Sequence, residues 1–525
     1  MLLFTNGTIH TMDPANPTPE AVLIGDDGRI RAAGRAADLD APGVRRIDLG
    51  GRTLLPGFND AHVHVWKLGL LLTVQVDARS AVAPDIASII DRFHERAVGL
   101  PAGTWITGRG YNETSMPERR HLTRADLDAA SPNHPIALTR TCGHMIVANS
   151  AALAVAGITR DTPNPPGGLI VRDASGEPIG LLQETAMGLL THAMPPTDDT
   201  TMADGIRAAM RHQLALGITS ATDPLLTPPI LEVYRQLERD GALRVRINGL
   251  PIRRPDGGNE TLPLPERFVS DTLRIDCVKF FADGGLSGAT AAISQPYKVT
   301  GDCGVLRFET DDLLHLAWEA HEAGFRIATH AIGDVALDQV IGVYEALHAR
   351  KPGTGLRHRI EHLGLPSAEH LRRCQAMDVI AVPQTIFLSA LGGAFRRYLP
   401  DAFMPRCYPV RAMLDAGLTV ALSSDAPVVA DDSPLSGMKA AIDRRDPFGE
   451  PITPEQAMSG YEALHAYTMG GAIASGDADN RGSLTPGKWA DLVILSGDPL
   501  AATPDGLLDL RAEQTYVGGR LAWEA

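Results

Sequence analysis

Two histidines, His62 and His64, stand one residue apart at the end of an apolar run, LLPGFNDAHVH, over residues 54–64. Side chains alternate between the two faces of a strand, so both imidazoles would project from the same side. They could be two buried histidines with structural hydrogen bonds, or the first half of a metal site. Two ligands are too few for a catalytic metal, so the pair needs partners elsewhere in the chain.

Four further residues could supply those partners, and each lies in or directly after an apolar run of the kind that forms strands. They are Lys279 in VKFFADG, His330 in ATHAIGD, His362 in RIEHL and Asp425 in LSSDAP. Taken singly, a histidine here can be structural, a lysine can reach out to solvent, and an aspartate can cap a turn. Together, imidazole nitrogens and carboxylate oxygens form a donor set that suits zinc or a related divalent ion. Counting the strand that ends in His62 and His64, suitable groups occur at five strand ends, and this coincidence favours the metal site.

Strand-like and helical segments alternate along the middle of the chain, and these elements must position the candidate residues. Helical periodicity is clearest at residues 311–324 and 336–350. With LLPGFND as the first strand we expect eight strands, the others at 217–223, 243–250, 274–284, 325–334, 358–364, 378–385 and 418–427. Strand–helix alternation repeated to eight is typical of the α/β (β/α)₈ or TIM barrel, whose catalytic residues collect at the carboxyl ends of the strands. The candidate residues would then converge at one mouth.

The rest of the chain predicts two additions to a distorted barrel. Short β-type runs and turns fill residues 1–55 and return at 480–525, which predicts a small β-sandwich domain built from both termini. Roughly 150 residues separate the first two barrel strands, far more than one connecting helix needs. We therefore expect a barrel over residues 56–479, with an inserted subdomain at about 68–200 that emerges at the catalytic face and could cover the site.

Composition narrows the function class. The chain has 525 residues and a formal net charge of −15, and it contains no compensating basic block. This charge argues against a nucleic acid or an anionic membrane as partner. The five cysteines are scattered and form no CxxC pair, and the first residues lack the pattern of a signal peptide. We expect a cytoplasmic protein that acts on a small molecule.

Seven stretches together resemble the amidohydrolase superfamily, in its amidohydrolase-3 or YtcJ-like branch of metal-dependent hydrolases. They are PGFNDAHVH (56–64), TRTCGHMIVANSAAL (139–153), VKFFADG (278–284), ATHAIGD (328–334), RIEHL (359–363), LSSDAP (422–427) and GSLTPGKWADLVIL (482–495). The likeness covers nearly the whole chain. The two opening histidines, the two later ones and the aspartate are specific as a set, although none is specific alone.

The resemblance implies a role for each position. His62 and His64 would bind the more buried metal with Asp425 near it, and His330 and His362 would hold a second. Lys279 corresponds to a lysine that many relatives carry as a carbamate bridging two metals, which replaces a repelled ammonium by an anionic oxygen ligand. The resemblance implies one or two divalent ions, Zn²⁺ with Mn²⁺ or Fe²⁺ as alternatives. It also implies, without other support, a homodimer.

The implied reaction is hydrolysis. A zinc-type ion lowers the pKa of water toward about 7 and polarises a carbonyl. Asp425 would take the proton of the water and deliver it to the leaving nitrogen, as general base and then acid. His144 resembles a family histidine that faces the substrate, and Tyr111 stands where relatives commonly have tryptophan, so we expect both at the substrate. The segment GGLSGATA (284–291) lacks an arginine that many relatives carry.

We therefore expect a metal-dependent hydrolase that cleaves a non-peptide C–N bond of an amide, formamide or carbamate. An ester or lactone hydrolase is the alternative among enzymes, because the same hydroxide attacks those carbonyls. A non-catalytic binding or regulatory protein built on the barrel is the alternative outside enzymes.

Overall fold

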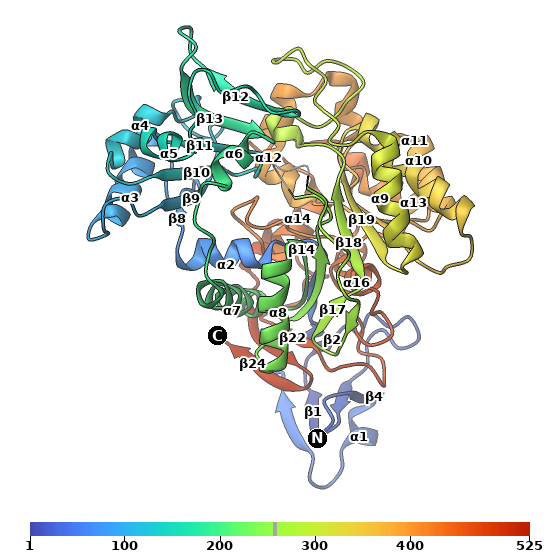
Figure 1. Ribbon diagram of the computed structural model, residues 1–525. Coiled ribbons are helices and arrows are strands. Elements are labelled where there is room, and N and C mark those ends of the chain that lie inside the picture. Colours follow the sequence, from blue (N-terminus) through green and yellow to red (C-terminus); the bar gives the residue numbers. More distant parts are fainter. Residues whose placement is uncertain (256–259) are drawn as a thin grey trace.

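Strands from the middle of the chain, parallel except at one edge, form two sheets in the computed structural model, which describes residues 1–255 and 260–525 (Figure 1). The first sheet has the order β16-β17-β15-β14-β7 and the second β18-β19-β20-β21. Their bounds are β7 (Phe58–Asp60), β14 (Ile218–Leu226), β15 (Arg246–Pro251), β16 (Phe268–Val269), β17 (Leu273–Ile275), β18 (Cys277–Phe281), β19 (Arg326–Ala331), β20 (Arg359–His362) and β21 (Ile380–Val382).

Isolated bridges, rather than continuous ladders, join the two sheets at both edges. A parallel bridge links Ile252, next to β15, to Lys279 in β18. At the other edge Val420 makes a parallel bridge with Ala381 of β21, and the N–H of Ala61 donates to the carbonyl of Leu422 over 3.4 Å. The result is an α/β, TIM-barrel-like fold whose ladder is not continuous.

The predicted eighth strand, 418–427, is the clearest departure from the expected pattern. It makes one bridge at Val420 and is otherwise irregular. Asp425 has a φ of 56°, and the following Pro427 has no N–H to donate to a ladder. The residues that carry chemistry here are therefore incompatible with a regular strand.

Helices on the outside of the strands follow the predicted periodicity. α9 (Thr310–Glu322) and α10 (Asp334–Arg350) form where the sequence predicts helices. On α10 the side chains of Leu337, Val340, Ile341, Tyr344 and Leu347 are buried at helical spacing. Each such aliphatic side chain contributes roughly 1.5–3 kcal/mol to folding, which fixes α10 against β19 and β20.

Both ends of the chain contribute to one five-stranded sheet of order β2-β6-β22-β23-β24, beside a four-stranded sheet of order β4-β3-β1-β5. Figure 1 shows both termini at the same end of the molecule. The bounds are β1 (Leu2–Thr5), β2 (Thr8–Ile9), β3 (Ala21–Ile24), β4 (Ile30–Gly34), β5 (Arg45–Asp48), β6 (Thr53–Pro56), β22 (Leu492–Leu495), β23 (Ala512–Val517) and β24 (Arg520–Glu524).

Gly57 connects this terminal sheet to the barrel-like strands, since it is the one residue between β6 and β7. A Cβ at this position would lie 2.3 Å from the side chain of Thr219, so a larger residue would push β7 away from β14. The glycine thus sets the close approach that brings His62 and His64 to the ends of the strands.

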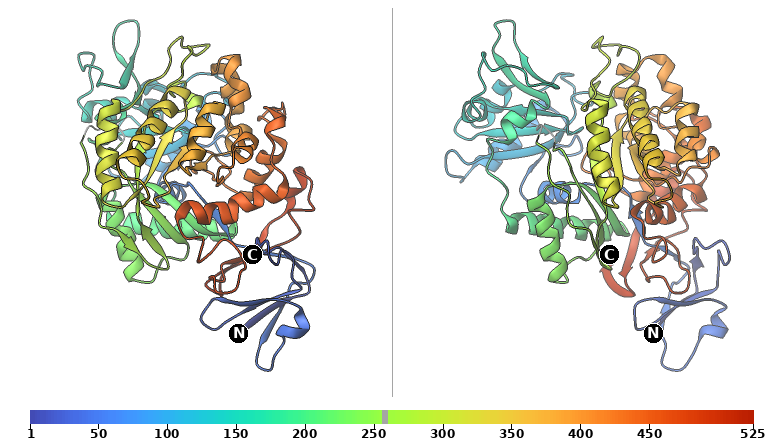
Figure 2. Two further views of the ribbon diagram at one scale, coloured as in Figure 1. Left: turned by 90° about the vertical axis from the view of Figure 1, so that its right-hand side faces the viewer. Right: turned by 45° about the vertical axis from the view of Figure 1, so that its right-hand side comes forward.

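A separate six-stranded sheet, of order β12-β13-β11-β10-β9-β8, forms within residues 76–184. Its strands are β8 (Val76–Asp77), β9 (Ile106–Tyr111), β10 (Ile136–Arg140), β11 (Met145–Ala148), β12 (Gly168–Arg172) and β13 (Pro178–Glu184). Helix α3 (Ile86–Ala97) packs on one face, where Phe93 is fully buried. Figure 2 shows this sheet beside the barrel-like strands, at the end far from the termini. Within the described ranges, no helix has the length and apolar character needed to cross a bilayer.

Candidate metal centre

His62, His64 and Asp425 converge beyond the end of β7. One ligand atom from each lies within 4.8 Å of the other two, and all three side chains are buried. Oδ1 of Asp425 is 3.1 Å from Nε2 of His64 and 3.5 Å from Nε2 of His62. Two imidazoles and a carboxylate around one point are the donor set expected for a zinc-type ion, so these residues fit a metal.

The backbone holds the two segments in this register. The N–H of Asp425 donates to the carbonyl of His62 over 2.7 Å, and the N–H of His64 donates to the carbonyl of Ala426 over 2.8 Å. The Asp60 carboxylate accepts from the Ser424 hydroxyl at 2.5 Å and from the N–H groups of Ser424 and His62. Asp60 therefore ties the histidine segment to the aspartate segment.

His330 and His362 lie beside this trio at the ends of β19 and β20. In the parallel ladder His330 is opposite Glu361, and Ala331 is opposite His362. The ring centroids of His330 and His362 are 4.4 Å apart, and those of His62 and His362 are 5.1 Å apart. The four imidazoles that the sequence places at strand ends are thus neighbours in space.

Lys279 lies in the middle of β18 and is fully buried. Its Nζ is 4.6 Å from the ring centroid of Phe281, two residues along the same strand face. The same ring lies 4.8 Å from that of His330, so Lys279 and His330 approach the centre from neighbouring strands.

Backbone strain concentrates at two of the candidate ligands. His362 and Leu363 have φ values of 73° and 46°, and Asp425 has 56°. Non-glycine residues adopt this left-handed region at a cost of roughly 1–3 kcal/mol each, and such residues cluster at functional sites. The strain turns both side chains out of the regular strand direction.

Three polar residues that the sequence reasoning missed orient the histidines. Nδ1 of His62 contacts Oε2 of Glu361, whose Oε1 accepts from Nε of Arg359 at 2.5 Å. Nδ1 of His362 lies 2.6 Å from Oε1 of Gln384, and Nε2 of His330 lies 3.0 Å from the carbonyl of Gly284 and 3.4 Å from Oδ1 of Asp283. The only sequence signal was their presence within or near the motifs RIEHL, FFADG and VPQT.

The charges at the centre match what metal binding needs. Burial alone raises the pKa of Asp425, but His62 and His64 outweigh it and hold that pKa far below its usual range. Burial lowers the pKa of His64 to about 3 and that of His362 well below its ordinary value. Neutral imidazoles and an ionised carboxylate are the protonation states in which these groups bind a cation.

A cavity of about 30 Å³ lies next to the centre, with His144, His330, His362 and Asp425 in its wall. This is room for a water-sized occupant. The remaining wall is largely apolar, and includes Leu286, Ile332, Phe387, Leu391, Phe395, Tyr408 and Val428. Nδ1 of His144 lies 3.1 Å from Oε2 of Glu184, which fixes the ring that the inserted segment brings to the cavity.

Tyr111 is placed differently from His144. It is fully buried in the hydrophobic core of the inserted sheet, and its hydroxyl lies 3.2 Å from Nδ1 of His121. The substrate contact expected for Tyr111 stays a prediction.

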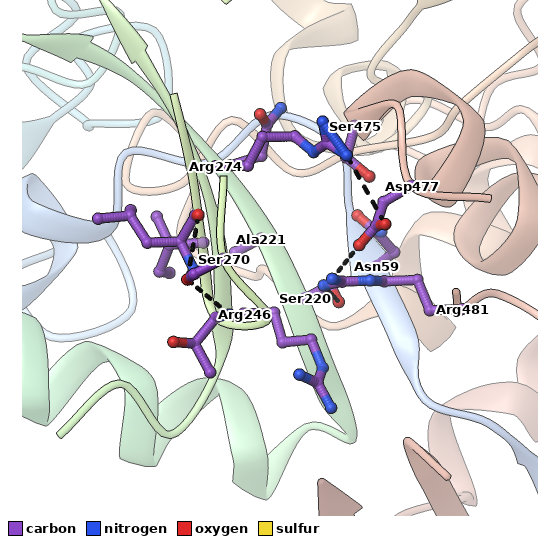
Figure 3. Close-up of a pocket in the computed structure, with 13 residues that line it drawn as sticks. Asn59, Ser220, Ala221, Arg246, Ser270, Arg274, Ser475, Asp477 and Arg481 are labelled. Atoms are coloured by element: carbon purple, nitrogen blue, oxygen red, sulfur yellow. Dashed lines mark hydrogen bonds and ion pairs between the residues drawn. The ribbon is translucent and has the colours of Figure 1, made fainter. Parts of the chain in front are cut away.

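A second polar pocket lies near the amino ends of β14 and β15 (Figure 3). Arg274 and Arg481 approach Asp477 there, and Asn59 also lines it. Its volume is about 10 Å³, which is no larger than one water needs. A pocket of this size has no room for a small-molecule substrate.

Comparison with known proteins gives the family. The model of the amidohydrolase family, Amidohydro_3, matches residues 45–522. YtcJ of Bacillus subtilis, named as an amidohydrolase, is 31% identical over 99% of both chains. The N-substituted formamide deformylase of Arthrobacter pascens is 31% identical over 100% of this chain and 98% of its own.

Among solved structures, an uncharacterized metal-dependent hydrolase from Pyrococcus horikoshii superposes with a TM-score of 0.77. It is 26% identical and covers 96% of this chain and 99% of its own. The resemblance read from the motifs is thus confirmed, and the protein is a metal-dependent hydrolase that acts on C–N bonds. The chain belongs to the amidohydrolase family.

Proposed function

We propose that this chain hydrolyses a non-peptide C–N bond of a small amide, formamide or carbamate. The convergence of His62, His64 and Asp425 within 4.8 Å carries the proposal, because it joins a metal donor set to a candidate general base. The similarity to a formamide deformylase supports a formamide or a related small amide. We infer a distorted (β/α)₈ barrel, with the terminal β-sandwich and the insertion at about 68–200 as its additions, acting in the cytoplasm as a homodimer.

The proposed ligands are His62, His64, Lys279 as its carbamate, His330, His362 and Asp425. When bound, a zinc-type ion would supply Lewis acidity, lowering the pKa of water and polarising the carbonyl of the substrate. Zn²⁺ is the proposed ion, with Mn²⁺ or Fe²⁺ as alternatives and a second ion held by His330 and His362.

The side chain of Asp425 would transfer the proton. Asp425 is ionised because the adjacent imidazoles hold its pKa low, so it can accept a proton from water at neutral pH. The same carboxyl then protonates the leaving nitrogen. His144 faces the cavity between the inserted segment and the centre and would contact the substrate carbonyl region. The apolar wall excludes bulk water and strengthens these interactions.

A metal-depletion experiment on paired substrates tests the proposal. Protein purified without chelators is analysed for bound metal and assayed on an N-benzylformamide and on the matching benzyl formate. We expect hydrolysis of the formamide or of a related small amide, loss of that activity with a chelator, and recovery with Zn²⁺, Mn²⁺ or Fe²⁺. Hydrolysis of esters alone would favour the ester alternative. Undiminished amide hydrolysis in metal-free protein would refute the proposal.

A further inference from the structure

A cavity of about 350 Å³ lies between the inserted sheet and helix α2 (Val65–Thr73), which starts directly after His64. Figure 1 shows α2 below β8 and β9. Gly143 lines this cavity, and its neighbours Cys142 and His144 line the cavity at the metal centre. One short loop therefore separates the two spaces. The volume is in the range of small-molecule sites.

The wall of this larger cavity is mostly apolar but contains two basic residues, Arg109 and Lys67. Its apolar part includes Trp66, Leu70, Ile146, Met187, Leu225 and Ile252. No aspartate or glutamate lines it among the residues that the structure describes. A cavity with apolar walls and a buried guanidinium is suited to an apolar molecule that carries a negative group.

Strand alternation aims Arg109 into the cavity. Thr107 and Arg109 share one face of β9, and Ala137 and Thr139 share the same face of the adjacent β10. The opposite face packs on α3, where a Cβ at Gly108 would lie 2.4 Å from the ring of Phe93. Arg109 is thus the charged residue on the cavity side of the sheet.

The guanidinium of Arg109 has no carboxylate partner. Arg109 is 7% exposed, its Nε is buried without a hydrogen bond, and it forms no ion pair with any residue in 1–255 or 260–525. The neighbouring Arg140, which is also buried, shows the contrast: its Nε donates to Glu113 at 2.7 Å. A buried charge without a partner is costly, so it persists where a ligand supplies the partner.

Arg109 is also close enough to the centre to act in the same reaction. A Cβ on Gly143 would lie 3.2 Å from Nη2 of Arg109, so the loop that carries His144 passes directly over the guanidinium. Burial lowers the pKa of Arg109, and the carboxylate of Asp425 is among the groups that oppose this. The proposed general base therefore lies within electrostatic range of this arginine.

We propose that Arg109 binds a carboxylate of the substrate, and that the 350 Å³ cavity holds the apolar body to which that carboxylate is attached. This inference rests on the proposed function and specifies its substrate class: an amide whose apolar portion carries a carboxylate remote from the scissile C–N bond. The planar fork of a guanidinium matches two carboxylate oxygens, and a dry site strengthens the pairing.

Equilibrium binding tests this without requiring turnover. Isothermal titration calorimetry on the full chain compares a set of phenyl- and alkyl-substituted carboxylates, hydrocinnamate among them, with their neutral amides. We expect the carboxylates to bind more tightly than the amides. Arg109→Met should weaken carboxylate binding by about 30-fold or more, since one partner of a buried charge pair is lost. Arg109→Lys should recover part of it, and Arg96→Met, on the exposed face of α3, should change nothing.

Two further titrations distinguish this cavity from other places where an anion could bind, namely the metal centre and a site for any small anion. Titrations repeated on chelator-treated protein should retain the carboxylate binding and its dependence on Arg109, whatever the outcome for hydrolysis. Inorganic phosphate should bind weakly, because it has no apolar body to bury. The proposal is overturned if no carboxylate binds better than its amide, if Arg109→Met leaves carboxylate binding intact, if binding disappears with the metal, or if phosphate binds more tightly than the carboxylates.

Discussion

Oε1 of Gln384 lies 2.6 Å from Nδ1 of His362, and the amide nitrogen of the same glutamine donates to the hydroxyl of Ser423 at 2.8 Å. An amide oxygen only accepts hydrogen bonds, so Nδ1 of His362 carries the proton and Nε2 is left as the donor atom for a cation. Gln384 therefore fixes both the orientation and the tautomer of a proposed ligand.

Replacing Gln384 should weaken metal binding more than folding. In Gln384→Leu the imidazole of His362 loses its acceptor, and partners of this kind typically account for about 10–100-fold in metal affinity or activity. We expect a loss of that size in a metal titration, with Tm measured on chelated protein nearly unchanged. Gln375→Leu, at an exposed position of helix α11 (Ala368–Ala376), is the matched control. Equal metal affinity in both variants would contradict the role.

Glu361 should matter for folding as well. It is fully buried between Arg359 and His62, and although burial raises its pKa, Arg359 and His62 hold that pKa well below the usual range. Glu361→Gln leaves Arg359 buried without its counter-ion, which typically destabilises by about 3–5 kcal/mol. We expect a clear drop in Tm together with lower metal content.

The exposed pair Glu369–Arg372 offers a control for Glu361. Its two side chains are 57% and 68% exposed, and such surface pairs contribute about 0–1 kcal/mol. Glu369→Gln should therefore leave Tm and metal content as they are. A Tm for Glu361→Gln as high as that of this control would mean that Arg359 is satisfied by the carbonyls of Ala61 and Ala474 alone.

The sequence predicts those site residues that lie at the ends of apolar strands. His62, His330 and His362 follow apolar runs, and parallel strands bring their carboxyl ends to one edge, so their proximity could be expected from pattern alone. The orienting residues could not, because a partner such as Gln384 is identified by where its side chain points, and glutamine is common at exposed positions. The same limit applies to Arg109, whose isolation from carboxylates is visible only in three dimensions.

The fold divides in the same way into regular strands that the sequence predicts and an irregular segment that it does not. Strands β14, β15, β18, β19, β20 and β21 lie within or close to the predicted segments because apolar β-branched runs are strong local signals. The segment around Asp425 departs from a strand because its backbone, with a φ of 56° at Asp425, is held by the tertiary hydrogen bond from the N–H of Asp425 to the carbonyl of His62, which no local pattern encodes. Strain of this kind is expected where function competes with regular structure.

Asp425→Asn should separate proton transfer from metal binding. The amide keeps the shape of the carboxylate but cannot accept the proton of water, and general acid–base groups typically contribute about 10²–10⁴-fold. We expect turnover to fall by at least about 100-fold while His62 and His64 retain much of the metal. Asp431→Asn, at an exposed position six residues along, should keep full activity. An Asp425→Asn protein with undiminished turnover would disprove the proposed role.

Asp223, within β14, should make stability depend on pH. Its carboxyl is fully buried, and burial raises its pKa to about 8, although the hydroxyl of Tyr234 donates to it at 2.5 Å. In the unfolded chain the same group titrates near 3.9. Between these two values the unfolded state binds fewer protons than the folded state, so the free energy of unfolding falls as pH rises.

Asp223→Asn removes this titration, so the dependence of Tm on pH should change in one direction. The Tm of the variant minus that of the wild type should become more positive from about pH 5 to about pH 8, because only the wild type loses stability through this group. Asp204→Asn, at an exposed position of helix α7 (Asp199–Ala215), should give a flat difference. A flat difference for Asp223→Asn as well would show that the carboxylate is ionised throughout this range. In that case the hydrogen bonds from Tyr234 and from the N–H of Trp66 outweigh burial.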